Sequence, residues 1–307
     1  MPLRFTLRQL EYFVAVGEAG GVAPAAAQIN ISSPTISAAI TALEAEFGLQ
    51  LFVRHHAQGL SLTPGGRQFY AEAKVILERA DSLRDLAGDI SGGVRGPLHV
   101  GSLVTLSALM PPALRRSFER AYPETKLSQT SADQARLFEL LRRAEIDVAL
   151  TYDMEIPQDI QLHPLTELPP YVLVSANHEW AKRDSLSVHE LPSAPMILLD
   201  LPISRDYFLS VFVKRGLRPM IAERTNDMAI VRSLVANGFG FSLVNTRTNA
   251  AVAPDGAPLA FIPLIDGPPP ITLGIATAAS DYTPGIVSAF IAHCREKIER
   301  EGPPGLV

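Results

Sequence analysis

The chain has 307 residues, a formal net charge of -5, 47% hydrophobic residues and 19% charged residues. This length predicts two or three domains with sizeable cores, and the composition excludes a disordered chain. The N-terminus lacks a signal-peptide pattern and no apolar run approaches the roughly 20 residues that span a bilayer, so we expect a soluble, cytoplasmic protein.

Residues 1–63 predict three helices and a hairpin. The first two helices are expected over 7–17 and 22–28, and the third follows Ser32, which stands where an N-cap belongs, with Pro34 in its opening turn. Small and polar residues near the open N-terminal end of this third helix are typical of the recognition helix of a helix-turn-helix, which enters the DNA major groove by that end. The expected core consists of Leu10, Phe13, Val14, Ala26, Ile36, Ile40 and Leu43, and Phe47 continues the apolar stripe of the third helix.

The segment from Leu49 to Thr63 alternates apolar and polar residues in two short runs, which predicts a hairpin wing. His55 and His56 lie in its turn, where adjacent histidines are more often solvated than metal ligands, and we predict no metal site. Residues 1–95 contain eight Lys/Arg and nine Asp/Glu. Since phosphate contacts supply much of DNA affinity, a DNA-binding function requires these few cations to be well placed.

Residues 64–90 predict one long helix, capped by Thr63 and opened by Pro64. Its apolar residues follow a 4-3-4-3 spacing, which indicates a short coiled coil that pairs two chains. The alternative is a helix that lies against its own domain. The expected dimerisation residues are Phe69, Ala73, Ile76, Ala80 and Leu83.

A glycine-rich segment around residues 91–97 predicts a hinge, after which strands and helices alternate. Strands are expected at 98–100, 126–130 and 147–151, with helices at 106–120 and 134–143 between them, an order that implies a parallel sheet covered by helices. A second set, from about 165 to 264, has strands at 171–174, 196–199, 220–224 and 239–244 and helices at 204–215 and 227–236. A strand at 271–276 and a helix at 284–300 return to the first lobe.

Three N-terminal stretches, LRQLEYFVAVGEAG, AAAQINISSPTISAAITALEAEFGLQLFVR and LSLTPGG, resemble in order and spacing the signature of the LysR-type transcriptional regulators. ERAYPETKL, LRRAEIDVALTY and VRSLVANGFGFSLV are similar to that family's effector-binding domain. The resemblance implies an α/β protein with a winged helix-turn-helix (1–63), a dimerising linker helix (64–90) and a two-lobed effector module (98–307) built like a periplasmic binding protein. Lobe I would comprise 98–164 and 268–307, and lobe II 165–267.

The same resemblance implies a tetramer of two dimers that binds double-stranded promoter DNA, with RNA polymerase as a further partner to consider. The DNA-reading residues would be Ser33, Pro34, Thr35, Ser37 and Ala38, and Arg54 in the wing would contact the phosphate backbone. The family often has Gln at the position of Ser33 and a long polar residue at that of Ala38. An alanine offers a base edge only apolar contact, so DNA shape is expected to contribute more to specificity here.

Effector-binding residues are expected at strand ends, where open α/β sheets bind ligands. Hydroxyls and amides beside helix N-termini suit an anionic group, and we predict a small effector with a carboxylate and an aromatic or branched body. The alternative for Ser204 and Asn226 is that they only cap helices. No cation stands among these positions, although Arg205 is close to one of them. The expected residues are Ser102, Thr105, Ser131, Thr151, Leu201, Ser204, Phe208, Asn226 and Asn245.

The favoured function is therefore a DNA-binding regulator that responds to a small molecule. A solute-binding module would leave the first 90 residues without a role. An enzyme on the same fold is disfavoured because the sequence shows no nucleophile-base pair, no metal-ligand cluster and no dinucleotide fingerprint, and no cofactor is predicted. Cys294, the only cysteine, has no partner for a disulfide switch.

Overall fold

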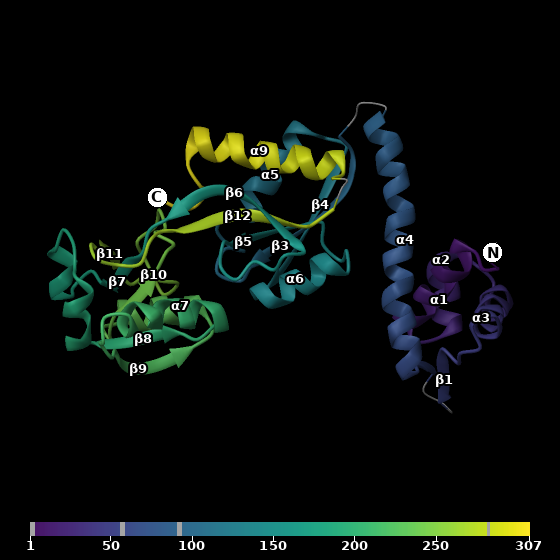
Figure 1. The fold of residues 1–307 in the computed structure, drawn as a ribbon, viewed down its shortest axis with the longest axis horizontal. Coiled ribbons are helices and arrows are strands. Elements are labelled where there is room, and N and C mark those ends of the chain that lie inside the picture. Colours follow the sequence, from purple (N-terminus) through teal and green to yellow (C-terminus); the bar gives the residue numbers. More distant parts are fainter. Residues whose placement is uncertain (1–3, 56–58, 91–93, 281–282) are drawn as a thin grey trace. The chain divides into compact units, whose positions relative to one another are not determined.

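A computed structural model of the chain describes residues 4–55, 59–90, 94–280 and 283–307. The chain divides into two compact units, residues 1–93 and 94–307 (Figure 1). The division falls within the segment predicted as a hinge, of which residues 91–93 lie outside the described residues.

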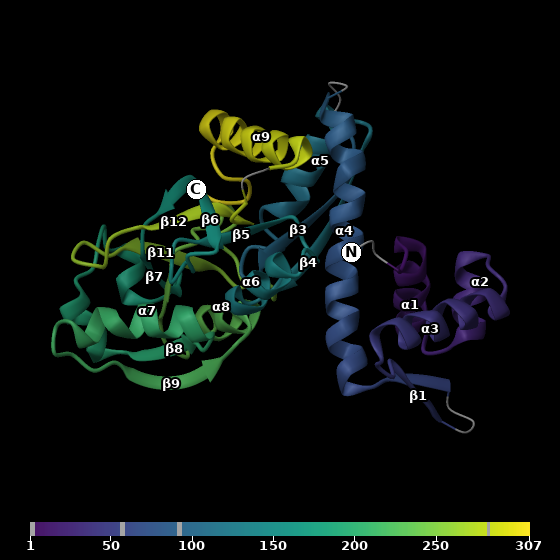
Figure 2. The same ribbon diagram turned by 45° about the vertical axis from the view of Figure 1, so that its right-hand side comes forward.

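The first unit is a three-helix core with a hairpin and one long helix (Figure 2). All seven residues predicted for its core are buried, together with Leu51 and Phe52 from the start of the hairpin. Phe47, in contrast, is exposed and stacks against the rings of Phe5 and Phe69. The elements are α1 (Leu7–Ala19), α2 (Val22–Ile29), α3 (Ser33–Phe47), the antiparallel strands β1 (Phe52–His55) and β2 (Gly59–Leu62), and α4 (Pro64–Ile90).

Side-chain caps set where these helices begin. The hydroxyl of Ser32 accepts a hydrogen bond from the backbone N–H of Thr35, and Thr63 Oγ1 accepts from the N–H of Gly66 at 2.8 Å. Each cap satisfies a backbone donor that has no partner inside the helix. The predicted starts of α3 and α4 are thus confirmed.

The first lobe of the second unit is built on a five-stranded sheet in the order β4-β3-β5-β12-β6. β3 pairs in parallel with β4 and β5, whereas β12 is antiparallel to β5 and β6, so the sheet is mixed rather than parallel throughout. Helices α5 and α9 cover one face and α6 the other (Figure 1). The strands are β3 (Gly96–Leu103), β4 (Thr125–Ala132), β5 (Val148–Tyr152), β6 (Ile160–Leu168) and β12 (Ile271–Ala278), and the helices α5 (Pro111–Ala121), α6 (Gln134–Arg142) and α9 (Gly285–Glu301).

The second lobe has two small sheets joined by a bridge between Met196 and Phe241. One apolar cluster lies under α7 and contains Phe208 and Phe212, and another lies under α8 and contains Val231 and Val235. Its strands are β7 (Tyr171–Ser175), β8 (Pro195–Leu199), β9 (Met220–Thr225), β10 (Ser242–Val244) and β11 (Leu259–Pro263). The helices are α7 (Pro202–Val213), α8 (Met228–Ala236) and two 3-10 turns, Glu179–Lys182 and Val188–Ser193.

Three predictions about these lobes were wrong in detail. The helix expected from residue 106 begins only at Pro111, because Pro111 and Pro112 have no backbone N–H to donate to the preceding turn and fit only the first positions of a helix. Strands β6 and β11 were not predicted. Because β6 pairs with β12 up to Leu168, residues 165–168 belong to the first lobe and not the second. None of the helices in the described residues combines the length and apolar composition needed to cross a bilayer.

Candidate functional sites

Three neighbouring cavities lie where the two lobes of the second unit meet. Their volumes are about 50, 30 and 900 Å³. Thr105, after β3, lines all three, and Ser204, in the first turn of α7, lines the two smaller ones. Met228 and Thr246 line both the 30 and the 900 Å³ cavities. These shared walls make the three cavities one cleft.

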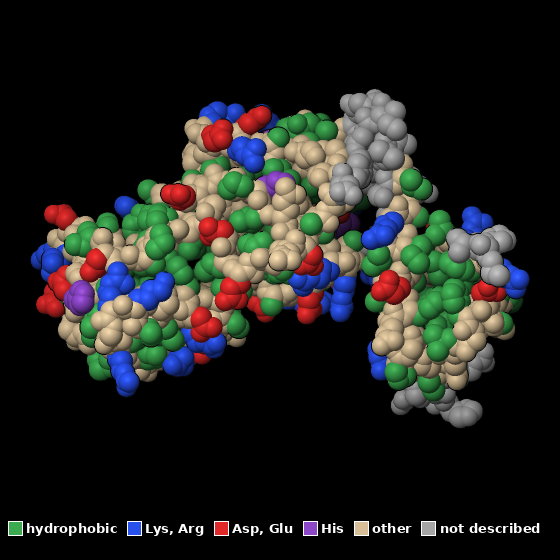
Figure 3. Space-filling model, viewed as in Figure 1, with side chains coloured by type: hydrophobic (Ala, Val, Ile, Leu, Met, Phe, Trp, Pro, Cys, Tyr) green, Lys and Arg blue, Asp and Glu red, His purple; other side chains and the backbone are tan. Residues whose placement is uncertain are grey.

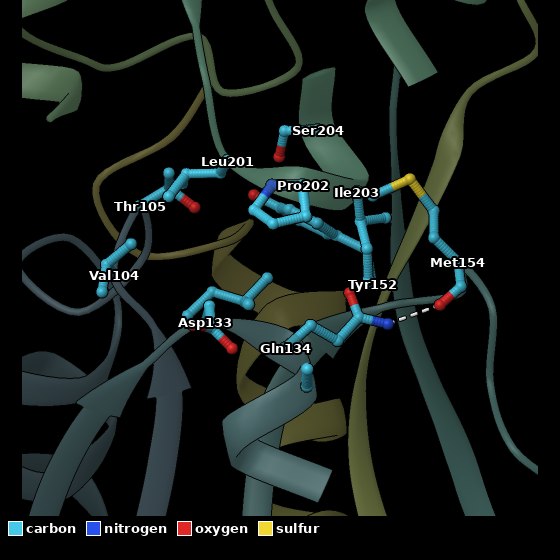
Figure 4. A pocket seen from close by; sticks show the side chains of 12 residues that line it. Val104, Thr105, Asp133, Gln134, Tyr152, Met154, Leu201, Pro202, Ile203 and Ser204 are labelled. Carbon is cyan, nitrogen blue, oxygen red and sulfur yellow. Dashed lines mark hydrogen bonds between the residues drawn. The ribbon is translucent and has the colours of Figure 1, made fainter. Parts of the chain in front are cut away.

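Neutral polar groups and the side chain of Asp133 line the inner part of this cleft (Figure 4). The buried Tyr152 hydroxyl is hydrogen-bonded to Thr105, and burial raises the pKa of Tyr152 to about 12, so that the phenol stays protonated. The amide of Gln134 donates to the carbonyl oxygen of Met154. Asn245 donates to the carbonyl oxygen of Leu168 at 3.0 Å. Together with apolar neighbours, these groups can bind and orient a small organic molecule.

Helix α7 begins at the cleft without a side-chain cap. Its N-cap residue is Leu201, Pro202 opens the helix, and Ser204 follows in the first turn. α8, by contrast, is capped by Asp227, whose carboxylate accepts from the N–H of Ala229 at 2.7 Å. The alternative that Ser204 and Asn226 serve as N-caps is therefore wrong for both. The first-turn backbone N–H groups of α7 therefore have no side-chain acceptor, and such groups can bind an anion.

Six of the nine predicted effector residues line the cleft, and three do not. Ser102 and Thr151 are fully buried within β3 and β5, and their hydroxyls have no hydrogen-bond partner among the described residues. Ser131 is exposed near the end of β4. These three lie within strands that continue further than predicted, which places them away from the cavity walls. The six cleft residues are Thr105, Leu201, Ser204, Phe208, Asn226 and Asn245.

The charged residues of the cleft differ from the prediction. Arg205 pairs with Asp200 and Asp206, so its charge is already compensated. Arg232, on α8, was not predicted and lines the 900 Å³ cavity. In sequence it is a single arginine on an otherwise apolar helix, a pattern that usually indicates a solvated residue.

The N-terminal end of α3 presents small residues. Pro34, Thr35 and Ala38 are exposed, whereas Ser33 and Ser37 are half-buried. The Thr35 hydroxyl lies 2.7 Å from that of Ser32 and is hydrogen-bonded to it. A contact between Thr35 and a DNA base would therefore compete with this bond at the helix cap. The visible face of the first unit in Figure 3 is mostly hydrophobic or neutral, with few cations. The side chain of Arg54, predicted to contact DNA from the wing, lies outside the described residues.

The predicted dimerisation residues of α4 fall into two groups. Ala73 is only 1% exposed and Phe69 packs against the core of its own unit. Ala73 is thus buried within its own unit and Phe69 is half-buried there, so these two residues contribute less to any contact with a second chain than the exposed ones. Ile76 and Leu83 are 40% and 65% exposed, and Ala80 is half-buried. Among the described side chains of α4, the apolar surface that a partner helix could cover therefore lies between Ile76 and Leu83.

The described residues contain no group of three or more potential metal ligands. Cys294 is buried on α9, and burial raises the pKa of its thiol. A thiol that remains protonated is a poor nucleophile, which makes Cys294 unsuited to redox chemistry in the folded protein.

Residues 7–67 match the family described as bacterial regulatory helix-turn-helix protein, lysR family, and residues 91–299 match the LysR substrate binding domain. The HTH-type transcriptional regulator BsdA of Bacillus subtilis is 30% identical, with 78% of this chain and 83% of that protein covered. HinK of Pseudomonas aeruginosa, a LysR family regulator, is 33% identical over 96% of this chain and 98% of its own, with a TM-score of 0.64. Full-length CbnR, solved in complex with its target DNA, is 26% identical over 95% of this chain and 99% of its own, with a TM-score of 0.68.

Proposed function

The chain belongs to the LysR family of transcriptional regulators, and we propose that its cleft binds a small effector that carries a carboxylate. The observation that carries this proposal is the uncapped start of α7 at a cavity lined by Thr105 and Ser204. Free backbone N–H groups and hydroxyls favour an anion, while Leu201 and Phe208 offer apolar contact to the body of the ligand.

The proposal for DNA places the N-terminal end of α3 in a major groove and the hairpin β1–β2 beside it. Thr35 and Ala38 are exposed at that end, in keeping with this orientation. The DNA complex of CbnR supports promoter binding by this chain. Two chains would pair through α4, and two such dimers would form a tetramer. The tetramer would bring several α3 helices, and the few cations near them, to one DNA molecule. Effector binding would bias that assembly and thus transcription.

A gel-shift titration on a DNA site selected in vitro tests the DNA-binding assignment. Arg54→Ala should weaken binding to all sequences and lower the slope of affinity against salt by about 1, because one phosphate contact is lost. Thr35→Val should instead change the preferred sequence. Arg183→Ala is the matched control, since Arg183 pairs with Glu190 in the second unit. Unchanged affinity in Arg54→Ala would show that the wing assignment is wrong.

Two other functions have less support. A solute-binding module would account for residues 94–307 but not for the helix-turn-helix match over 7–67. For an enzyme, the relatives offer no support, since BsdA and HinK are both named as regulators. A turnover assay on effector candidates would separate an enzyme from a receptor.

A further inference from the structure

Arg232 is the one Lys or Arg among the described residues that line the three cavities. It lies in the middle of α8, and the 900 Å³ cavity that it lines also contacts Leu201 and Thr246. This places a permanent positive charge in the wall of the cleft.

The guanidinium of Arg232 is held in place by hydrogen bonds that occupy only some of its N–H donors. Its Nη2 donates to the carbonyl oxygens of Ala250 and Val252, at 3.2 and 2.6 Å. Its Cζ lies 5.8 Å from the centre of the Phe261 ring. A guanidinium has five N–H donors, and the three on Nε and Nη1 have no partner in the described part of the chain. The group is therefore fixed, with donors left for a ligand.

The charge of Arg232 also lacks a counter-ion. No carboxylate of the described residues lies within ion-pair distance, whereas Arg205 and Arg224 both pair with Asp200. The two acids that line the same cavity are bound to their own helices, Asp133 to the N–H of Arg136 and Asp227 to that of Ala229. Burial lowers the pKa of Arg232, yet an arginine remains charged at neutral pH. A partly desolvated cation without a counter-ion favours an anionic ligand.

A second unused donor lies in the same walls. Thr246 is only 7% exposed, lines both the 30 and the 900 Å³ cavities, and its hydroxyl makes no hydrogen bond within the described part of the chain. A hydroxyl in a cavity wall that makes no bond inside the protein can donate to, or accept from, a ligand atom. Arg232 and Thr246 thus offer a charged and a neutral donor to one bound group.

We infer that Arg232 is the specificity-determining residue for the effector, and that it binds a carboxylate of a small organic acid with Thr246 as a second donor. This inference rests on the proposed effector site and refines it: Arg232, in the 900 Å³ part of the cleft, binds the carboxylate, in place of the start of α7. A carboxylate accepts two N–H donors from a guanidinium in a bidentate pair, which an amide of the same shape cannot match. The body of the acid then contacts the apolar side chains of Leu201 and Met228.

The test is a thermal-shift titration of the full-length protein with aliphatic and aromatic monocarboxylates, each beside its neutral amide. Acids should stabilise the wild type and amides should not. Arg232→Gln should weaken acid binding by about tenfold to a hundredfold and abolish the preference over the amide. Arg232→Lys should keep part of the preference because it keeps the charge, and Thr246→Val should weaken the acid several-fold.

Two controls separate recognition from folding. The unfolding temperature of each variant without ligand reports any stability lost with the hydrogen bonds from Arg232 to Ala250 and Val252. Arg247→Gln removes an exposed arginine that stacks on Tyr171 outside the cleft, and it should bind acids as the wild type does. Equal acid binding by wild type and Arg232→Gln would overturn the inference while leaving the cleft proposal intact. If amides stabilised the protein as strongly as acids, or if no acid stabilised it, the proposal that the effector carries a carboxylate would be wrong. If neutral compounds still stabilised the protein, the proposal that the cleft binds a small molecule would stand.

Discussion

Gly66 shows how closely the long helix α4 is joined to the winged core. A Cβ atom at this position would lie 2.1 Å from the carbonyl oxygen of Leu51, a backbone atom that cannot move aside. The N–H of Gly66 also donates to Thr63 Oγ1 in the helix cap. Gly66→Ala should therefore destabilise the first unit by about 1–3 kcal/mol, as overpacking of a rigid site does.

Circular dichroism during thermal unfolding measures this effect, with Gly65→Ala as the matched control. The three atoms nearest to a Cβ at Gly65 would all belong to the side chain of Leu49, the nearest at 3.0 Å, and this side chain can shift because Leu49 is 37% exposed. The control should unfold close to the wild type. Equal unfolding temperatures for the two variants would refute the steric argument.

Single residues also mark the limit of what the sequence could predict about the site. Hydroxyls and amides at strand and helix ends follow from chain order, and this placed Thr105, Ser204 and Asn245 at the cleft. Arg232 could not be found that way, because its contacts with residues 250–252 and Phe261 come from segments that no pattern links to α8. Ser102 and Thr151 were misplaced because the ends of strands are uncertain by a few residues.

At the scale of the element, apolar periodicity and caps predicted most helices. The starts of α3 and α4 follow from Ser32 and Thr63, whose side chains satisfy backbone donors. Strand β6 was missed because Pro164 interrupts its pattern, although β6 tolerates this proline at a sheet edge. The spacing of apolar residues on α4 predicted an apolar stripe, but the sequence could not tell which part of the stripe packs against the same chain.

The exposed part of that stripe leads to a prediction about assembly. Leu83→Asp should weaken dimerisation at least tenfold, because it places a charge in an apolar contact while the core of the first unit is untouched. Val213→Asp on α7, another exposed apolar residue, should leave the assembly unchanged. Sedimentation velocity over a concentration series measures both. A Leu83→Asp protein that assembles as the wild type would show that α4 does not pair chains.

For the whole molecule, the chain divides into units 1–93 and 94–307. The two proposed ligands, DNA and the effector, would bind to different units. The residues proposed to contact DNA belong to the first unit, and every residue that lines the cleft belongs to the second. A regulator needs these two binding events to influence each other, and such coupling is a free energy that must appear equally in both directions.

Calorimetric unfolding of the full-length protein measures that coupling. An effector at 100 times its Kd should stabilise the unfolding step of residues 94–307 by about 2.7 kcal/mol and leave that of residues 1–93 unchanged without DNA. A DNA site should stabilise the step of the first unit. With both ligands present, the total should depart from the sum of the separate effects by about 1–3 kcal/mol, the usual size of allosteric coupling. Simple additivity would mean that occupation of the cleft is not transmitted to the DNA-binding unit.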